Sequence, residues 1–157
     1  MFELLPGVGV VLPRGAGMLR FGMSEQRAQW TLSTVLDVRA YWSCAGTRYH
    51  DDGHRRFWSF GGSLGTLRVD VTGSEHGCRT IAFERLPGTT TDPVAWRDVD
   101  LFGYPAGEVE AALPGAAERE RIGLLLDPPA AGSAASTDDR PTRVRLTTED
   151  VSAYRPG

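Results

Sequence analysis

The chain has 157 residues, of which 41% are hydrophobic and 24% charged, and its formal net charge is −3. This size and composition are typical of one soluble globular domain, which buries about two thirds of the surface that its unfolded chain exposes. An acidic chain offers no electrostatic footprint for nucleic acid or for an anionic membrane surface, so we expect neither as a partner. All 17 basic residues are arginine, and lysine and asparagine are missing. Because those two residues have A/T-rich codons, the bias indicates a GC-rich bacterial genome rather than selection for arginine chemistry.

The compartment is predicted from the N-terminal segment and the cysteines. Residues 1–10 lack the basic start and the apolar run of a secretory signal. No segment approaches the roughly 18 apolar residues of a transmembrane helix. We therefore expect a cytoplasmic protein in which Cys44 and Cys78 are free thiols.

The first elements in chain order are a turn-rich segment and a helix. Residues 1–18 contain many glycines and prolines, which predicts turns rather than a helix. Ser24 is a good N-cap, and the helix that it begins is expected to run to about Leu36. Its apolar face comprises Ala28, Leu32, Val35 and Leu36.

The middle of the chain predicts an antiparallel meander. Strand character occurs around 41–42, 48–50, 55–61, 67–72 and 79–85, and Asp52-Gly53 has the chemistry of a tight hairpin turn. In the fourth segment Leu67, Val69 and Val71 alternate with Arg68, Asp70 and Thr72. This period of two is typical of a strand with one buried face, and Ile81 and Phe83 are expected to point inward in the next strand.

The last third predicts one more strand, a second helix and a final strand pair. The strand covers 94–101, and the helix begins at Pro105 and is stopped by Pro114-Gly115. The strand pair is formed by 121–126 and 142–147. Between them, 128–141 is a low-complexity segment that we expect to be a flexible loop within a single domain, 1–157.

One sequence motif occurs twice and suggests the architecture. Residues 19–32 are LRFGMSEQRAQWTL and residues 100–113 are DLFGYPAGEVEAAL, so the two Phe-Gly pairs align. Each copy is a strand end, a turn and a helix start. The predicted fold class is α+β, with a twisted antiparallel sheet of about 6–7 strands and two short helices packed on one face. The other face is left open.

A serine motif gives a weak indication of catalysis. Gly61-Gly62-Ser63-Leu64-Gly65 fits the pattern G-x-S-x-G. A nucleophile elbow needs a helix directly after the serine, whereas here a strand follows. We therefore interpret the motif as a glycine-rich hairpin turn and expect no catalytic residue.

Histidines and one cysteine could form a metal site. His50, His54, His76 and Cys78 flank two hairpin tips that the meander would place at one end of the sheet, near Asp51, Asp52 and Glu75. Zinc accepts such ligands, but neither a C-x-x-C nor an H-x-x-x-H motif occurs on a helix. Polar residues at solvated turns are the favoured interpretation, so we expect no metal and no cofactor.

Other patterns favour structural roles. The aromatic residues are Tyr41, Trp42, Tyr49, Phe57, Trp58, Phe60 and Trp96. Without a basic surface, they indicate a core rather than a platform for nucleic-acid bases. The glycine-rich PGVGVV and RGAGML segments do not fit a phosphate-binding motif. The carboxylate pairs are expected at solvated turns and strand edges; they are Asp51-Asp52, Asp98/Asp100 and Asp138-Asp139.

Residues 14–28, RGAGMLRFGMSEQRA, resemble the opening of a family of uncharacterised proteins from GC-rich bacteria. That opening has the pattern G-x-G-x-[IL]-R-[FL]-G-M-[ST]-x-x-E-V. Residues 99–113, VDLFGYPAGEVEAAL, are similar to a later segment of the same proteins. Here Arg27-Ala28 replaces the family's Glu-Val, and the last hairpin carries the low-complexity insert. The resemblance implies a strand meander and a final strand pair, and it assigns no activity to any residue.

The helix start is also similar, more distantly, to two binding proteins. They are the small lipoprotein of the outer-membrane assembly machinery and the β-lactamase-inhibitory protein, neither of which is an enzyme. This is an analogy of fold and names no partner.

No motif is specific enough to assign an activity, so three hypotheses remain open. The first is a non-catalytic module that binds another protein, as an immunity or inhibitor protein does. It predicts a contiguous apolar or aromatic patch on the open face of the sheet. The second is a small metal- or ligand-binding enzyme that uses His50, His54, His76 and Cys78. The third is a structural subunit that dimerises through a sheet edge. We expect the protein to be a monomer or a homodimer.

Overall fold

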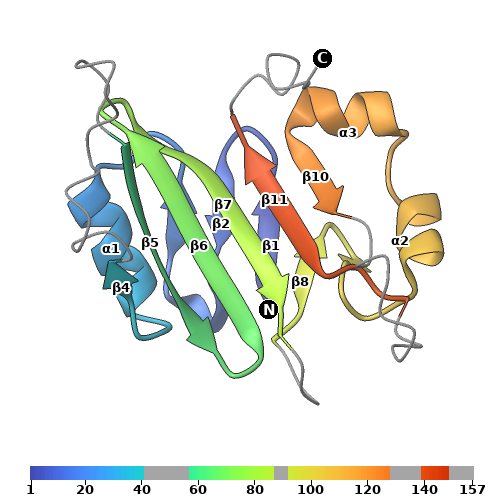
Figure 1. The fold of residues 1–157 in the computed structure, drawn as a ribbon, viewed down its shortest axis with the longest axis horizontal. Coiled ribbons are helices and arrows are strands. Elements are labelled where there is room, and N and C mark those ends of the chain that lie inside the picture. The colour runs from blue at the N-terminus through green and yellow to red at the C-terminus, as the bar shows by residue number, and fades with distance from the viewer. Residues whose placement is uncertain (41–56, 87–91, 128–138, 149–157) are drawn as a thin grey trace.

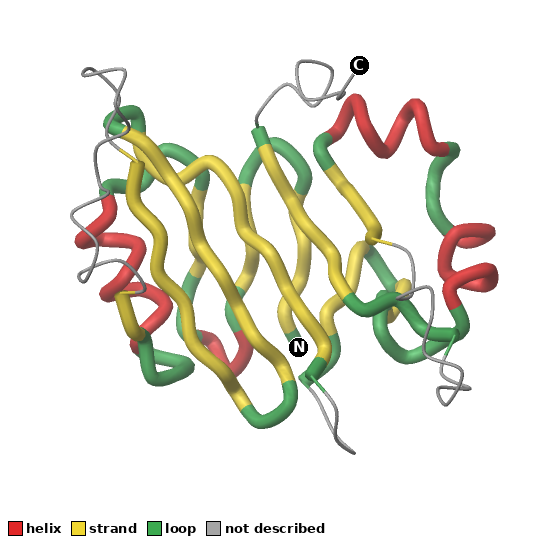
Figure 2. The backbone as a smooth tube through the Cα atoms, viewed as in Figure 1, coloured by secondary structure: helices red, strands yellow, loops and turns green. Residues whose placement is uncertain are grey.

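The computed structural model describes residues 1–40, 57–86, 92–127 and 139–148, and it confirms an α+β fold (Figure 1). The strands are divided between two sheets that lie one in front of the other, as the backbone trace shows (Figure 2). Three α-helices and one short 3-10 helix complete the described part of the chain. The sequence predicted a sheet with short helices, but not that a second sheet would cover the first.

The six-stranded sheet contains the predicted meander. Its order is β10-β11-β7-β6-β5-β4, and every pair is antiparallel. Its strands are β4 (Arg39–Ala40), β5 (Phe57–Leu64), β6 (Leu67–Ser74), β7 (Gly77–Arg85), β10 (Leu124–Asp127) and β11 (Arg143–Thr147). The predicted alternation is confirmed, because Leu67, Val69 and Val71 of β6 are buried, as are Ile81 and Phe83 of β7. The predicted final strand pair, β10 and β11, is confirmed as well.

The five-stranded sheet has the order β3-β2-β1-β8-β9. Its strands are β1 (Phe2–Leu5), β2 (Gly9–Val11), β3 (Met18–Arg20), β8 (Val94–Trp96) and β9 (Val99–Asp100). Strands β1 and β8 are parallel, and the other pairs are antiparallel. The sequence predicted turns rather than a helix for residues 1–18, but not that β1 and β2 lie between those turns. Strands of three or four residues between glycines are too short for alternation to be recognised.

The core lies between the two sheets. A row of inward side chains crosses the six-stranded sheet in register: Phe60, Val71, Ile81, Leu146 and Leu124, all buried. From the other sheet, Phe2 of β1 contacts Phe83 of β7, with ring centroids 5.2 Å apart and ring planes at 60°. Because burying one such side chain contributes about 1.5–3 kcal/mol, this layer is the main source of stability.

The strands that begin the two copies of the repeated sequence motif form the two edges of the five-stranded sheet. Strand β3 is followed by α1 (Glu25–Ser33), and β9 is followed by α2 (Ala106–Ala112). Both are strand-to-helix corners, as predicted. Because β3 and β9 lie at opposite edges, the two helices lie on opposite sides of the molecule (Figure 1). In α1 the predicted face is confirmed, since Ala28 and Leu32 are fully buried, although the helix ends three residues before Leu36.

Two elements of the second half differ from the prediction. The strand expected over 94–101 is a hairpin, because the chain turns between Trp96 and Val99. Arg97 has a φ of 53°, a conformation for which glycine or asparagine is the usual signal, so nothing in the sequence marked this turn. A third helix, α3 (Ala116–Ile122), was not predicted. None of its residues is buried, so it has no apolar periodicity.

Several predictions fall on residues outside the described ranges. Segments 41–56 and 128–138 are among these, so Cys44, the Asp52-Gly53 hairpin and most of the expected loop 128–141 lie there. The described end of that loop is attached to two elements. The N–H of Ala106 donates to the carbonyl of Asp139 (2.8 Å), and Nε of Arg85 donates to the carbonyl of Pro141 (3.3 Å).

The N-cap of α1 gives a first testable prediction. The hydroxyl oxygen of Ser24 accepts a hydrogen bond from the N–H of Arg27 (3.3 Å). Ser24→Ala is expected to lower the free energy of unfolding by about 1 kcal/mol, because one helix donor loses its partner. Urea denaturation followed by circular dichroism measures this loss. Ser33→Ala, at the last residue of the helix, serves as the control; it removes the hydrogen bond from the Ser33 hydroxyl to the carbonyl of Trp30 (2.7 Å) but leaves the N-cap intact. Equal midpoints for the two variants would show that the cap contributes no more than this hydrogen bond at the other end of the helix.

Candidate functional site: an open hollow between β3 and α1

An open hollow of about 1000 Å³ lies where β3 turns into α1. It is lined by residues 11–12, 15–18, 20–24, 27 and 31. These residues come from β2, from the turn that joins β2 to β3, from β3 itself and from the first turns of α1. We call this surface the β3–α1 hollow. Most of its lining belongs to 14–28, the segment that carries the family resemblance.

The turn on one side of the hollow explains the glycine-rich sequence. Gly15 and Gly17 have φ values of 67° and 105°, which side chains other than glycine rarely adopt. The N–H of Leu12 donates to the carbonyl of Gly17 (2.9 Å) and closes the turn. These glycines therefore serve the backbone of the turn, as the absence of a phosphate-binding motif suggested.

The corner between β3 and α1 is attached to the other sheet. The N–H of Gly22 donates to the carbonyl of Cys78 (2.9 Å), and the N–H of Cys78 donates to the carbonyl of Met23 (2.7 Å). Within the corner, the N–H of Met23 donates to the carbonyl of Arg20 (3.3 Å). Because β7 holds this corner, the hollow has a rigid base rather than a loose loop.

The hollow combines an apolar base with positive charge. Met18, Phe21 and Met23 are half-buried, whereas Arg20 and Arg27 are exposed. No aspartate or glutamate lines the hollow. Within the described residues neither arginine has an ion-pair partner, so both guanidinium groups are available to a ligand.

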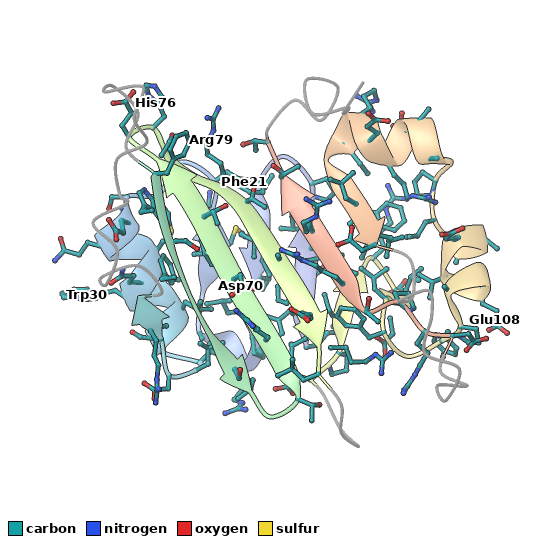
Figure 3. The ribbon with its side chains drawn as sticks, viewed as in Figure 1. Phe21, Trp30, Asp70, His76, Arg79 and Glu108 are labelled. Carbon is teal, nitrogen blue, oxygen red and sulfur yellow. The ribbon has the colours of Figure 1, made fainter. Side chains whose placement is uncertain are left out.

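A large aromatic side chain is exposed on α1. Trp30 is 73% exposed and projects from α1 away from the sheets (Figure 3). Residues three apart on a helix are neighbours, so Trp30 follows Arg27 on the same side of α1. Exposed tryptophan and arginine together are typical of protein interfaces.

The open face of the six-stranded sheet is polar. In register it carries Phe57, Ser59, Gly61, Ser63, Arg68, Asp70, Thr72, Thr80, Ala82, Glu84, Leu125, Asp127, Arg143, Arg145 and Thr147. Its charges pair with one another: Arg68 with Asp70 (3.3 Å) and Arg145 with Asp127 (3.4 Å). Phe57 is the one exposed aromatic residue among the described residues of this face, so the contiguous patch that we expected does not occur within the described ranges. This result counts against a binding surface on that face.

The serine of the G-x-S-x-G motif lies inside β5, and β6 follows it. The chain turns one residue later than expected, at Gly65-Thr66. Gly62 faces the segment between α1 and β4, where a Cβ would collide with the carbonyl of Asp37 and the side chain of Leu36. The glycine is therefore needed for close packing. A strand rather than a helix follows Ser63, as predicted, but residues 61–64 lie in β5, so the expectation that the motif itself forms the turn was wrong.

The histidine and cysteine candidates are placed only in part. His76 is 77% exposed at the β6–β7 turn, where Figure 3 shows it pointing out of the molecule beside Glu75. Cys78 is 2% exposed, and burial raises the pKa of its thiol to about 12. A thiol with that pKa stays protonated at neutral pH and is a poor metal ligand. His50 and His54 lie outside the described residues. No group of three metal-ligating side chains occurs within the described ranges.

The described aromatic residues mostly belong to the core. Trp58, Phe60 and Trp96 are buried, and the first two rings stack with centroids 5.6 Å apart. Phe57 is the exception, at the exposed start of β5. Tyr41, Trp42 and Tyr49 are outside the described ranges. For the described residues, the predicted core role is confirmed for three of four.

Sequence reasoning singled out the segment 14–28 but missed the hollow that it builds. The residues that line the hollow come from two short strands, the turn between them and the start of a helix, so no single periodic pattern contains them. The signal that could have found it is composition: Met18, Phe21 and Met23 occur within six residues, with Arg20 among them and Arg27 four residues later.

Comparisons with protein-family models, with curated proteins and with solved structures found no match to this chain. The family resemblance of residues 14–28 and 99–113 therefore stays a prediction. Among the described helices, none has the length and apolar character needed to cross a membrane.

Proposed function

We propose that this protein is a non-catalytic module that binds another protein, in the manner of an inhibitor or immunity protein. The β3–α1 hollow carries this proposal, because it exposes methionine, phenylalanine and arginine side chains on a rigid corner. Aromatic residues, methionine and arginine are enriched at protein interfaces and supply much of their binding energy. Methionine in particular adapts its shape to a partner surface.

Two further observations support the proposal. The segment that lines the hollow is the one that resembles non-enzymatic binding proteins. The buried free thiol of Cys78 is compatible with a reducing compartment, so we place the protein in the cytoplasm. The polar open face moves the proposed binding surface from the six-stranded sheet to the edge of the five-stranded sheet.

The proposal predicts a partner whose capture depends on the hollow. Met18→Asp puts a charge into the apolar base, whereas Ser63→Asp puts the same residue on the open face of the other sheet. The wild type and Ser63→Asp are expected to retain one host protein in stoichiometric amount. Met18→Asp is expected to lose at least nine tenths of it. Affinity purification followed by gel filtration and mass spectrometry measures this, with circular dichroism as the check of folding. Equal retention by the two variants, or no stoichiometric partner, would contradict the proposal.

A further inference from the structure

We propose that the β3–α1 hollow receives an acidic segment of the partner protein, in which carboxylates flank an apolar side chain. The inference rests on the proposed function and adds the chemistry of the partner. It depends on three observations. Two arginines in the hollow have no ion-pair partner among the described residues, the base of the hollow is apolar, and the backbone of Arg20 at the neighbouring edge of β3 is already hydrogen-bonded.

The hollow carries two arginines and no carboxylate. The chain as a whole is acidic, yet Arg20 and Arg27 line a hollow without one carboxylate. On the open face of the six-stranded sheet, by contrast, Arg68 and Arg145 are neutralised by neighbouring aspartates. Arg79 and Arg97 also have no ion pair among the described residues, but only Arg20 and Arg27 occur together in the lining of the hollow. A carboxylate-bearing ligand would complement both.

The base of the hollow requires an apolar group between the charges. Met18 and Phe21 come from β3 and the residue after it, and Met23 comes from the corner. Arg20 lies on the strand and Arg27 on the helix, so the two cations belong to different walls. A segment that places an apolar side chain between two acidic ones therefore matches this order of groups.

The edge of β3 limits how the segment binds. The N–H of Phe21 donates to the carbonyl of Val8, the residue before β2 (3.0 Å), so by alternation the backbone of Met18 and Arg20 faces away from the sheet. At Arg20 both backbone groups of this edge already have partners. The N–H of Arg20 donates to the sulfur of Met23 (3.5 Å), and the carbonyl of Arg20 accepts from the N–H of Met23 (3.3 Å). Only one residue of backbone remains for pairing. Side chains, rather than an added strand, must therefore supply most of the contact.

Other ligands fit less well. Nucleic acid needs a basic stripe that neutralises several phosphates, whereas the chain has a net charge of −3. A small molecule is usually enclosed over most of its surface, and this hollow is open. The observations thus favour a protein segment over both.

The test uses the full-length protein and twelve-residue fluorescent peptides. One peptide alternates Asp or Glu with Leu or Phe, a second replaces the acids by Asn or Gln, and a third replaces them by Lys. The receptors are the wild type, Arg20→Glu/Arg27→Glu, and the control Arg39→Glu/Arg121→Glu. The control exchanges two exposed arginines outside the hollow and changes the net charge equally. Anisotropy gives the affinity, and amide shifts of the ¹⁵N-labelled protein locate the site.

We expect the acidic peptide to bind the wild type and the control, and to shift amides of residues 15–24. Its affinity should fall at least tenfold on Arg20→Glu/Arg27→Glu, which should instead bind the lysine peptide.

The proposal is overturned by any of four results: no binding at 1 mM, equal binding of the neutral peptide, amide shifts only outside residues 15–24, or tighter binding of single-stranded DNA. If the captured host partner depends on Met18 but not on Arg20 and Arg27, this inference fails and the binding module stands. If no partner depends on the hollow, the proposed function itself fails.

Discussion

Phe83→Ala is expected to lower the free energy of unfolding by about 3–5 kcal/mol, the cost typical of removing a buried aromatic side chain. Phe83 is 1% exposed and contacts Phe2 across the interface between the two sheets. Both strands are held in their sheets by ladder hydrogen bonds on either side, so the surrounding backbone cannot collapse into the cavity. Urea denaturation followed by circular dichroism and by tryptophan fluorescence measures the change.

The matched control for this variant is an exposed aromatic residue. Trp30→Ala removes a larger side chain from the surface of α1, and its effect on stability is expected to stay within about 0.5 kcal/mol. A loss below about 1 kcal/mol for Phe83→Ala would show that the two sheets do not share a packed core.

Gly77→Ala is expected to cost about 2–4 kcal/mol, although it adds only one methyl group. Gly77 has a φ of 99°, and a Cβ there would collide with the backbone of Gly22. Relief of the collision would separate the corner from β7 and weaken the two hydrogen bonds that Cys78 makes with Gly22 and Met23. The strained backbone and the lost hydrogen bonds both contribute. Thermal and urea unfolding measure the loss, and capture of the partner should weaken with it.

Gly107→Ala separates this effect from the general consequence of losing a glycine. Gly107 lies inside α2, and no atom lies within 4 Å of the position of its Cβ. Alanine at that position is expected to stabilise the protein by about 0.5–1 kcal/mol. If Gly77→Ala were equally stabilising, the corner would not be held against β7.

Long amphipathic elements were predictable because one face of each is buried. The alternation of apolar and polar residues in β6 and β7 repeats over several residues, and the apolar face of α1 repeats over two helical turns. Patterns of this length rarely arise by chance. Ser24 added a local signal that needs no tertiary contact. The predicted α+β class therefore follows from the sequence.

The elements that were missed lack a local signal. The strands β1 and β2 are four and three residues long, which is too short for an alternating pattern to be recognised. They are held in place by pairing with other strands. The turn at Arg97 uses a residue that rarely adopts its conformation. The helix α3 buries none of its side chains. In each case tertiary packing, rather than propensity, decides the local structure.

The candidate site could be predicted only as a segment. The glycines, the Phe-Gly pair and the N-cap of residues 14–28 were all recognisable. That α1 would turn beside β3 and leave Arg20 and Arg27 unpaired depends on where β7 holds the corner. That contact joins residues more than fifty positions apart, so no local pattern contains it.

The order of strands in the two sheets has a consequence for how the chain folds. In the five-stranded sheet β1 pairs with β8, which lies about ninety residues later, and in the six-stranded sheet β11 lies between β7 and β10. Closing such long loops costs entropy before any contact offsets it, so folding should be slow relative to helical proteins of this size. During synthesis the β5–β6–β7 meander can form early. The five-stranded sheet can be completed once β9 has been made, but the six-stranded sheet is complete only after residues near 147 have left the ribosome. Until then β7 exposes an unpaired edge, and chains stopped short of β11 should aggregate rather than fold.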